Sequence, residues 1–342
     1  MNKIVLEDPR LDPRLKAAYG EMPVLVDLPQ VADREALLAM AAATMARFAD
    51  APKPDPAPYE ALAPSAGLSI RTIAIASQPD GNSINLQLIV PEGPGPWPCV
   101  YYIHGGGMMM SSCYETYMTA FGRLIAHMGV AVVQVDFRNS LYPSSVPEVA
   151  PFPAGLNDCV SGLRHVAENA AALGIDPAQI IVAGESGGGN LALAVAIKLG
   201  RDGDLGLLAG IFAMCPCIGG EWPGGAGTSA DRNDGILMAK PTNYMAMAYG
   251  IEQLYARNPL AWPGFASEDD VRGFPPTIIQ VNECDCLRDD GVAFYQLLLR
   301  AGVNARCREL LGTVHATEIG VILCPEISRD AARDMAALAR GD

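Results

Sequence analysis

The sequence predicts an α/β protein built on an open, mostly parallel sheet with helices on both faces. From about Leu68 onward, strand-like and helix-like segments alternate, and several strand-like segments are apolar throughout, as buried parallel strands are. The composition is that of a globular protein, because 50% of the 342 residues are hydrophobic and 18% are charged. This length accommodates one large α/β domain with an accessory part, or two domains.

The charge balance argues against nucleic acids and charged membrane surfaces as partners. The chain has 24 Lys+Arg against 38 Asp+Glu, a formal net charge of -14, and no basic run. Binding to phosphate backbones or anionic lipids needs a concentrated basic face. Met1 to Gly20 lacks the apolar core of a secretory signal, and Leu37 to Phe48 and Leu205 to Ile218 are too short or too interrupted to span a bilayer. We therefore expect a cytoplasmic protein without integral membrane contact, which could form a homodimer.

The N-terminal part is predicted to contain one amphipathic helix. It covers Ala36 to Phe48. One face of this helix carries Leu37, Met40, Ala41, Thr44, Met45 and Phe48. The proline-dense stretch Ala51 to Pro64 is not expected to hold a helix or a central strand, and so predicts a connector.

The main body is predicted to contain eight strands and four helices. The strands are expected at Leu68 to Ala76, Asn85 to Val90, Pro98 to Ile103, Val130 to Phe137, Gln179 to Ala183, Leu207 to Met214, Thr277 to Val281 and Ala305 to Leu310. The helices are expected at Glu115 to His127, Leu156 to Ala172, Asn190 to Leu199 and Gly291 to Ala301. Short turns such as Asp80-Gly81-Asn82 favour antiparallel pairing of the first strands.

An unusually long interval separates the strands that end at Met214 and begin at Thr277. It is rich in Gly, Pro, Trp and Met, and is longer than a crossover helix needs, so it predicts an insertion with its own helices. Together with the N-terminal helix it could form a cap. The expected organisation is an N-terminal part of the cap (1–50), a connector (51–67), core (68–217), cap insertion (218–272) and core again (273–342).

The motif Gly184-Glu185-Ser186-Gly187-Gly188 follows the strand QIIVA and opens the helix NLALAVAIKL. Such a strand-to-helix turn presents the serine hydroxyl at a helix N-terminus, and small flanking residues leave room for it. A glycine-rich turn with a solvated serine would not need this context. The motif therefore predicts that Ser186 is a nucleophile.

A serine nucleophile needs a base, and a carboxylate that orients the base. Of the four histidines, His315 lies in the loop after the last strand, whereas His127 and His165 lie in predicted helices. Asp285 falls just beyond the end of the preceding strand, and is preferred over Glu283. The chain order Ser186, Asp285, His315 is the order of an α/β-hydrolase.

Acyl transfer also needs hydrogen-bond donors for a developing oxyanion. His104-Gly105-Gly106-Gly107 comes directly after the strand CVYYI, where backbone N–H groups can approach a ligand closely. We expect the donors to be Gly106, Gly107 and Gly187.

These motifs give the chain a clear resemblance to the hormone-sensitive lipase family of α/β-hydrolases, the bacterial family IV esterases. The resemblance rests on HGGG, the serine motif, Phe152-Pro153-Ala154, Leu173-Gly174-Ile175-Asp176-Pro177 and Cys284-Asp285-Cys286-Leu287-Arg288-Asp289, and runs from about Leu68 to the C-terminus. It implies an α/β-hydrolase fold with an eight-stranded core and a helical cap, hydrolysis of carboxylic esters with short or medium acyl chains, and no cofactor.

The chain departs from that family at the serine motif and after HGGG. Glu185 and Gly187 stand where the family usually has Asp and Ala; Gly187 keeps its backbone donor and could leave extra space on the acyl side. Methionines follow HGGG, and methionine is adaptable, which suggests a permissive acyl pocket. The pocket residues expected are Met108, Met109, Glu185, Met45 and Phe48.

Two Cys-x-Cys pairs, Cys215/Cys217 and Cys284/Cys286, would end neighbouring strands. A zinc site needs four ligands in tetrahedral array, but this spacing is not the common one, so buried thiols are favoured and no metal is expected. The sequence leaves two alternatives to a carboxylesterase open. The same residues could cleave an amide, lactone or thioester, or the fold could serve as a non-catalytic binding module.

Overall fold

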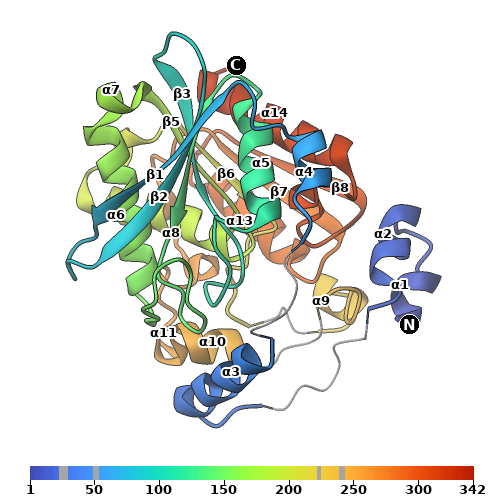
Figure 1. The fold of residues 1–342 in the computed structure, drawn as a ribbon. Coiled ribbons are helices and arrows are strands. Elements are labelled where there is room, and N and C mark those ends of the chain that lie inside the picture. Colours follow the sequence, from blue (N-terminus) through green and yellow to red (C-terminus); the bar gives the residue numbers. More distant parts are fainter. Residues whose placement is uncertain (23–29, 49–53, 222–224, 239–242) are drawn as a thin grey trace.

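The computed structural model describes residues 1–22, 30–48, 54–221, 225–238 and 243–342, with the backbone alone at Phe48. Its centre is an eight-stranded sheet with the strand order β1-β2-β4-β3-β5-β6-β7-β8 (Figure 1). The strands are β1 (Leu68–Ala76), β2 (Ser83–Pro91), β3 (Trp97–Ile103), β4 (Ala131–Asp136), β5 (Ile175–Glu185), β6 (Gly210–Met214), β7 (Thr277–Cys284) and β8 (Ala305–Val314). All eight predicted strands are thus present.

The pairing of the strands agrees with the prediction of a mostly parallel sheet. β2 is antiparallel to β1 and to β4, whereas the five pairs from β4–β3 to β7–β8 are parallel. Parallel strands end at one edge of the sheet, so the segments that follow β3, β5, β6, β7 and β8 meet there. The predicted site residues of the core lie in these segments, except Glu185, which is the last residue of β5.

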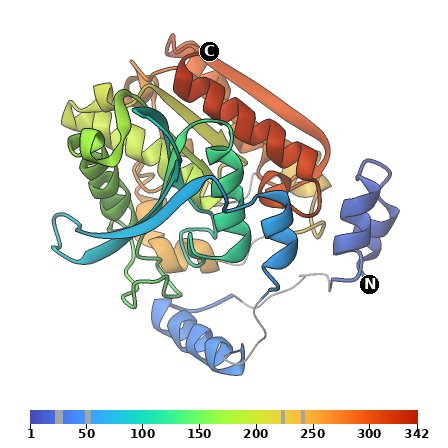
Figure 2. The same cartoon turned by 45° about the horizontal axis from the view of Figure 1, so that its top comes forward.

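Helices cover both faces of the sheet. The helices are α1 (Lys3–Glu7), α2 (Pro13–Tyr19), α3 (Arg34–Phe48), α4 (Ala57–Leu62), α5 (Thr116–Ala126), α6 (Ala154–Glu168), α7 (Ala170–Leu173), α8 (Gly187–Asp202), α9 (Ser229–Arg232), α10 (Tyr244–Tyr249), α11 (Ile251–Tyr255), α12 (Glu268–Val271), α13 (Arg288–Arg300) and α14 (Pro325–Arg340), with 3-10 turns η1 (Leu205–Leu207), η2 (Pro263–Phe265) and η3 (Thr317–Ile319). Buried side chains of α6, α8 and α13 form one apolar cluster with the sheet, and those of α5 and α14 form another. Figure 2 shows α14, in red, lying across the sheet.

Three parts of the helical prediction need correction. The connector does hold a helix, α4, because its prolines fall at the N-cap and in the first turn, where the missing N–H is not needed. The terminal helices α1, α2 and α14 were not predicted. The segment Leu156 to Ala172 spans two helices, since α6 ends at Glu168 and α7 begins at Ala170. Gly174, with a φ of 73°, caps the C-terminus of α7.

Helix α3 packs on the insertion between β6 and β7 (Figure 1). Leu37 and Ala41 are buried against Ala248 of α10, and the Arg34 Nε donates to the carbonyl of Ala248 at 3.3 Å. The predicted apolar face of α3 is only partly right, because Met40 and Met45 are 37% and 44% exposed. The insertion has its own helices, as predicted.

None of the helices in the described ranges is long and apolar enough to cross a membrane.

Candidate active site

Ser186 occupies a sharp turn between β5 and α8. Its φ of 55° and ψ of -117° are a conformation that non-glycine residues rarely adopt. The surrounding backbone holds it there: the Ser186 N–H donates to the carbonyl of Met214 at 2.9 Å, and its own carbonyl accepts from Asn190 and Cys217 at 2.9 and 3.0 Å. The turn therefore projects a partly exposed serine at the carboxyl edge of the sheet.

The glycines of the turn are required by close packing against the end of β3. A β-carbon at Gly188 would overlap the carbonyl oxygen of Ile103, and one at Gly184 would lie 2.6 Å from the same oxygen. The backbone of the serine turn therefore packs directly on Ile103, the residue that precedes the HGGG loop.

His315 and Asp285 form a hydrogen-bonded pair. Asp285 Oδ2 lies 2.7 Å from His315 Nδ1, and Asp285 Oδ1 accepts from the backbone N–H of Leu287 at 3.0 Å. The Asp285 side chain is fully buried, whereas that of His315 is 11% exposed. Burial lowers the pKa of His315, but the Asp285 carboxylate and the neighbouring Cys215 together more than offset this, so the pKa lies well above its ordinary value. The pair can therefore accept a proton and stabilise the imidazolium.

Ser186 and His315 both adjoin the peptide Met214–Cys215. The Ser186 N–H is hydrogen-bonded to the carbonyl of Met214. The Sγ of Cys215 lies within 4.8 Å of a ring nitrogen of His315 and of a carboxylate oxygen of Asp285. Within the described residues no hydrogen bond joins Ser186 to the His315 ring. Such bonds are often long before substrate binds, so the arrangement is compatible with proton transfer.

The backbone of Gly107 lies directly against Gly187. A β-carbon at Gly187 would lie 2.7 Å from Gly107 N and 2.6 Å from Met108 N. Gly106 and Gly107 have φ of 97° and 63°, which glycine adopts without strain. The proposed oxyanion donors are therefore neighbours. The expected extra space at Gly187 is absent, because the HGGG loop fills it.

Two buried side chains, His104 of the loop itself and Glu185 of β5, hold the HGGG loop in place. His104 Nδ1 donates to the carbonyl of Gly105 at 2.9 Å, and its ring stacks on Phe137 with centroids 4.4 Å apart. Glu185 Oε1 accepts from the Gly105 N–H at 2.5 Å, and Glu185 Oε2 accepts from the hydroxyl of Tyr102. Burial raises the pKa of Glu185 to about 7, although these two hydrogen bonds act to lower it. Both side chains link the loop to the sheet.

The predicted pocket residues do not gather at one place. Met108 and Glu185 are 1% exposed and lie inside the protein, which argues against a direct role in a pocket. Met109 does approach, since its Cε would be 3.4 Å from a β-carbon at Gly107. Met45 is exposed on α3, and the side chain of Phe48 lies outside the described part of the structure.

Two residues near the site were missed by the sequence analysis. Met245 of α10 would contact a β-carbon at Gly107 at 3.5 Å, and its Sδ lies 3.3 Å from Cys217 Sγ. Tyr19 of α2 is close enough to His315 for the charge of the imidazolium to act on its hydroxyl. The methionine-rich insertion could have suggested Met245, but nothing in the sequence points to Tyr19.

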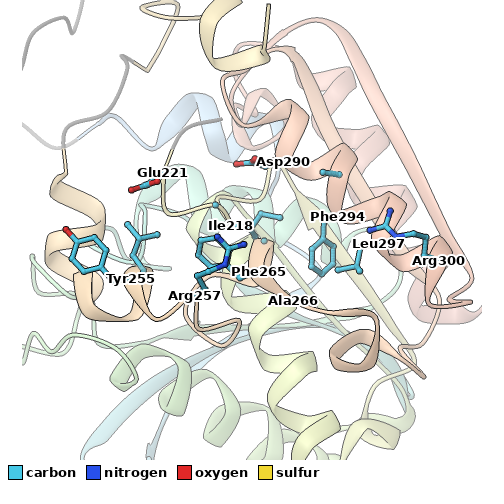
Figure 3. Close-up of a pocket in the computed structure, with 14 residues that line it drawn as sticks. Ile218, Glu221, Tyr255, Arg257, Phe265, Ala266, Asp290, Phe294, Leu297 and Arg300 are labelled. Atoms are coloured by element: carbon cyan, nitrogen blue, oxygen red, sulfur yellow. The ribbon is translucent and has the colours of Figure 1, made fainter. Parts of the chain in front are cut away.

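A pocket of about 580 Å³ opens beside this site rather than at it. Ile218, Leu254, Phe265, Phe294 and Leu297 are among its lining residues, whereas Ser186, Asp285 and His315 are not. Figure 3 shows Arg257 beside Phe265, with Glu221 and Asp290 apart from each other above them in the view. The Arg257 guanidinium carbon lies 4.3 Å from the centre of the Phe265 ring.

The four cysteines of the Cys-x-Cys pairs are buried free thiols and do not converge. Cys217 contacts Met245, Cys284 lies in the apolar cluster of α1 and α2, and the Cys286 thiol donates to the carbonyl of Asn233 at 3.4 Å. Among the described residues, the group that could hold a metal ion is instead Cys215, Asp285 and His315.

The chain belongs to the alpha/beta hydrolase fold family, whose model matches residues 100–319. It is 31% identical to carboxylesterase NlhH of Mycobacterium tuberculosis over 71% of this chain and 73% of that protein. Among solved structures, esterase Est22 is 50% identical with a TM-score of 0.91, covering 99% of this chain and 100% of that one. Brefeldin A esterase, described as a bacterial homologue of human hormone sensitive lipase, is 33% identical with a TM-score of 0.84, covering 98% and 96%. The predicted fold and the resemblance to the hormone-sensitive lipase family are confirmed.

Proposed function

We propose that this protein is a serine carboxylesterase that hydrolyses short- to medium-chain carboxylic esters through an acyl-enzyme on Ser186. The observation that carries the proposal is the hydrogen-bonded pair of buried Asp285 and partly exposed His315, 2.7 Å apart, at the sheet edge where the strained turn presents Ser186. The predicted class of reaction agrees with the relatives, which are named esterases and carboxylesterases.

The mechanism follows from the placement of these groups. Ser186 Oγ attacks the ester carbonyl carbon while the His315 ring takes the hydroxyl proton, and Asp285 holds the ring by its Nδ1–H. The N–H groups of Gly106, Gly107 and Gly187 stabilise the oxyanion of the tetrahedral intermediate. His315 then gives the proton to the departing alcohol. A water molecule, deprotonated by His315, releases the acid from Ser186 by the same two steps.

The substrate would bind under a cap formed by residues 1–50 and 218–272, joined through the connector 51–67 to the core, 68–217 and 273–342. Support comes from the packing of α3 on α10 and from the contact of Met245 with the oxyanion loop. Methionines at this boundary can adapt to different acyl chains. A cytoplasmic location and a homodimer remain predictions from the sequence.

The test is hydrolysis of p-nitrophenyl butyrate by the wild type, Ser186→Ala and His315→Ala, each checked for folding by circular dichroism. Loss of a nucleophile or base from such a triad lowers kcat by about 10⁴-fold or more. His127→Ala is the matched control. The side chain of His127 is exposed, and the hydrogen bond described for it joins it to the carbonyl of Pro64, away from the site. Undiminished turnover in a folded Ser186→Ala protein would overturn the proposal.

Substrates that differ only in the leaving group distinguish an esterase from an amidase, a lactonase or a thioesterase. Matched ester, amide and thioester substrates with the same acyl group, and a lactone, should show the highest kcat/KM for the esters. A folded wild-type protein that binds these compounds but turns over none would favour the non-catalytic binding module.

A further inference from the structure

Cys215 places a thiol beside the Asp285–His315 pair, where the proposed mechanism has no use for it. One ligand atom from each of Cys215, Asp285 and His315 lies within 4.8 Å of the other two. Cys215 and Asp285 are buried, and His315 is partly exposed. The three residues follow β6, β7 and β8, so adjacent strands of the sheet hold them together.

The backbone of Cys215 fixes the direction of its side chain. Its φ is 35°, in the left-handed region that a residue with a β-carbon rarely occupies. Its N–H donates to the carbonyl of Gln280 at 2.7 Å, and the neighbouring Cys217 N–H donates to the carbonyl of Ser186 at 3.0 Å. The conformation is thus held by the same hydrogen bonds that tie β6 to β7 and to the serine turn.

A thiolate, an imidazole and a carboxylate form a ligand set for zinc-like cations. Zinc takes S, N and O ligands at about 2.0–2.3 Å, which places neighbouring ligand atoms roughly 3.3–3.8 Å apart in a tetrahedron. The three ligand atoms lie within 4.8 Å of one another, and rotations of the side chains, with opening of the Asp285–His315 hydrogen bond, would bring them to this geometry. Three protein ligands leave the fourth position for water, as in catalytic zinc sites.

We propose that Cys215, Asp285 and His315 bind a thiophilic divalent cation, Zn²⁺ or Cd²⁺, and that the bound cation stops ester hydrolysis. As the sulfur–metal bond forms, the thiol proton passes to solvent, and no group is oxidised or reduced. The cation engages the imidazole that must accept the Ser186 proton and the carboxylate that orients it. The inhibition rests on the proposed function, but the binding does not.

The binding is tested by titrating protein dialysed against EDTA with CdCl₂ and following the ultraviolet absorption of the cadmium–thiolate bond. We expect saturation at one Cd²⁺ per chain in the wild type and in Ser186→Ala, and no such band in Cys215→Ser. The matched control is Cys307→Ser, which removes the partly exposed thiol of β8 and should leave the titration unchanged.

The inhibition is tested with ZnCl₂ in the p-nitrophenyl butyrate assay. Loss of an outer-sphere partner already weakens metal binding by about 10–100-fold, so loss of the sulfur ligand should raise the inhibitory zinc concentration at least about 100-fold. Cys215→Ser and Cys215→Ala should both hydrolyse the ester in the absence of metal.

Equal sensitivity of the wild type and a folded Cys215 variant to zinc, or a cadmium–thiolate band that persists in Cys215→Ser, would overturn the proposal. Two replacements at position 215 guard against a failure to fold in either one. If the wild type lacks esterase activity altogether, the absorption titration still decides whether the site exists.

Discussion

The backbone nitrogen of Gly107 lies 2.7 Å from the point where Gly187 would carry a β-carbon. Gly107 belongs to the loop after β3, and Gly187 is the first residue of α8. This contact brings the N–H groups proposed for the oxyanion site to one place, from segments about eighty residues apart in the chain. It also makes the glycine at 187 a requirement of this particular loop conformation.

Gly187→Ala is therefore expected to lower kcat, although alanine is usual here in the resembling family. The methyl group would force Gly107 and Met108 away from Ser186, and loss of one oxyanion donor lowers kcat by about 10²–10³-fold. Steady-state kinetics should show a change in kcat larger than that in KM. Gly200→Ala in the same helix, where a β-carbon would meet Leu205 only at 4.0 Å, is the control and should keep full activity.

Asp285→Asn should lower kcat by about 10⁴-fold while leaving KM nearly unchanged, because the amide would favour the wrong tautomer of His315. Asp285 raises the pKa of His315, and the neutral imidazole is the active base. Activity of the wild type should thus rise with pH as His315 loses its proton, and the residual activity of the variant should begin to rise at lower pH. Asp289→Asn should retain the wild-type pH profile, since Asp289 bonds to Ser229 instead.

Tyr102→Phe should destabilise the protein more at pH 8 than at pH 5. The hydroxyl of Tyr102 donates to Glu185 and lowers a pKa that burial holds at about 7. Above pH 7 Glu185 is ionised, and losing a donor to a buried charge costs about 1–3 kcal/mol. Thermal unfolding at both pH values measures the difference; an equal loss at both would mean that the charge of Glu185 does not change between pH 5 and pH 8.

Asp290→Asn should stabilise the protein, and more so at pH 8 than at pH 5. Asp290 Oδ2 is buried without a partner among the described residues, and burial, with the charges of Asp289 and Asp285, raises its pKa to about 7. Because the folded pKa exceeds the unfolded value of 3.8, stability is lost as pH rises toward and through 7. The gain at pH 8 could reach about 4 kcal/mol.

Thermal unfolding of Asp290→Asn against Asp330→Asn provides the check. Asp330 is exposed on α14 and pairs with Arg333, so its replacement should give no gain at either pH. A gain for Asp290→Asn that does not grow with pH would contradict the argument from ionisation.

The sequence was most informative about the parts of the site whose residues are adjacent in the chain. The serine motif and HGGG each form one turn, and the strands before them are apolar runs, so Ser186, Gly106 and Gly107 could be placed at a sheet edge. His315 and Asp285 could be predicted as partners because each lies just beyond one of the last two strands, and they lie 2.7 Å apart in the structure.

The remainder depends on contacts that no local pattern encodes. The position of the Cys215 thiol follows from a φ of 35°, which is set by hydrogen bonds to other strands. Which face of α3 is buried depends on α10, so Met45 could not be excluded from the pocket beforehand. α14, by contrast, has a local pattern that the prediction overlooked: its buried residues recur at helical spacing, among them Ala331, Met335 and Leu338.

The edge strand β8 carries His315 just beyond its last residue, Val314. An edge strand is bonded on one side only, so it opens more readily than the strands at the centre of the sheet. The proposed base, His315, therefore follows an edge strand, whereas the proposed nucleophile, Ser186, follows the central strand β5. Loss of activity would therefore indicate local unfolding of β8. At low denaturant concentration the enzyme would lose its activity while most of its secondary structure is still intact.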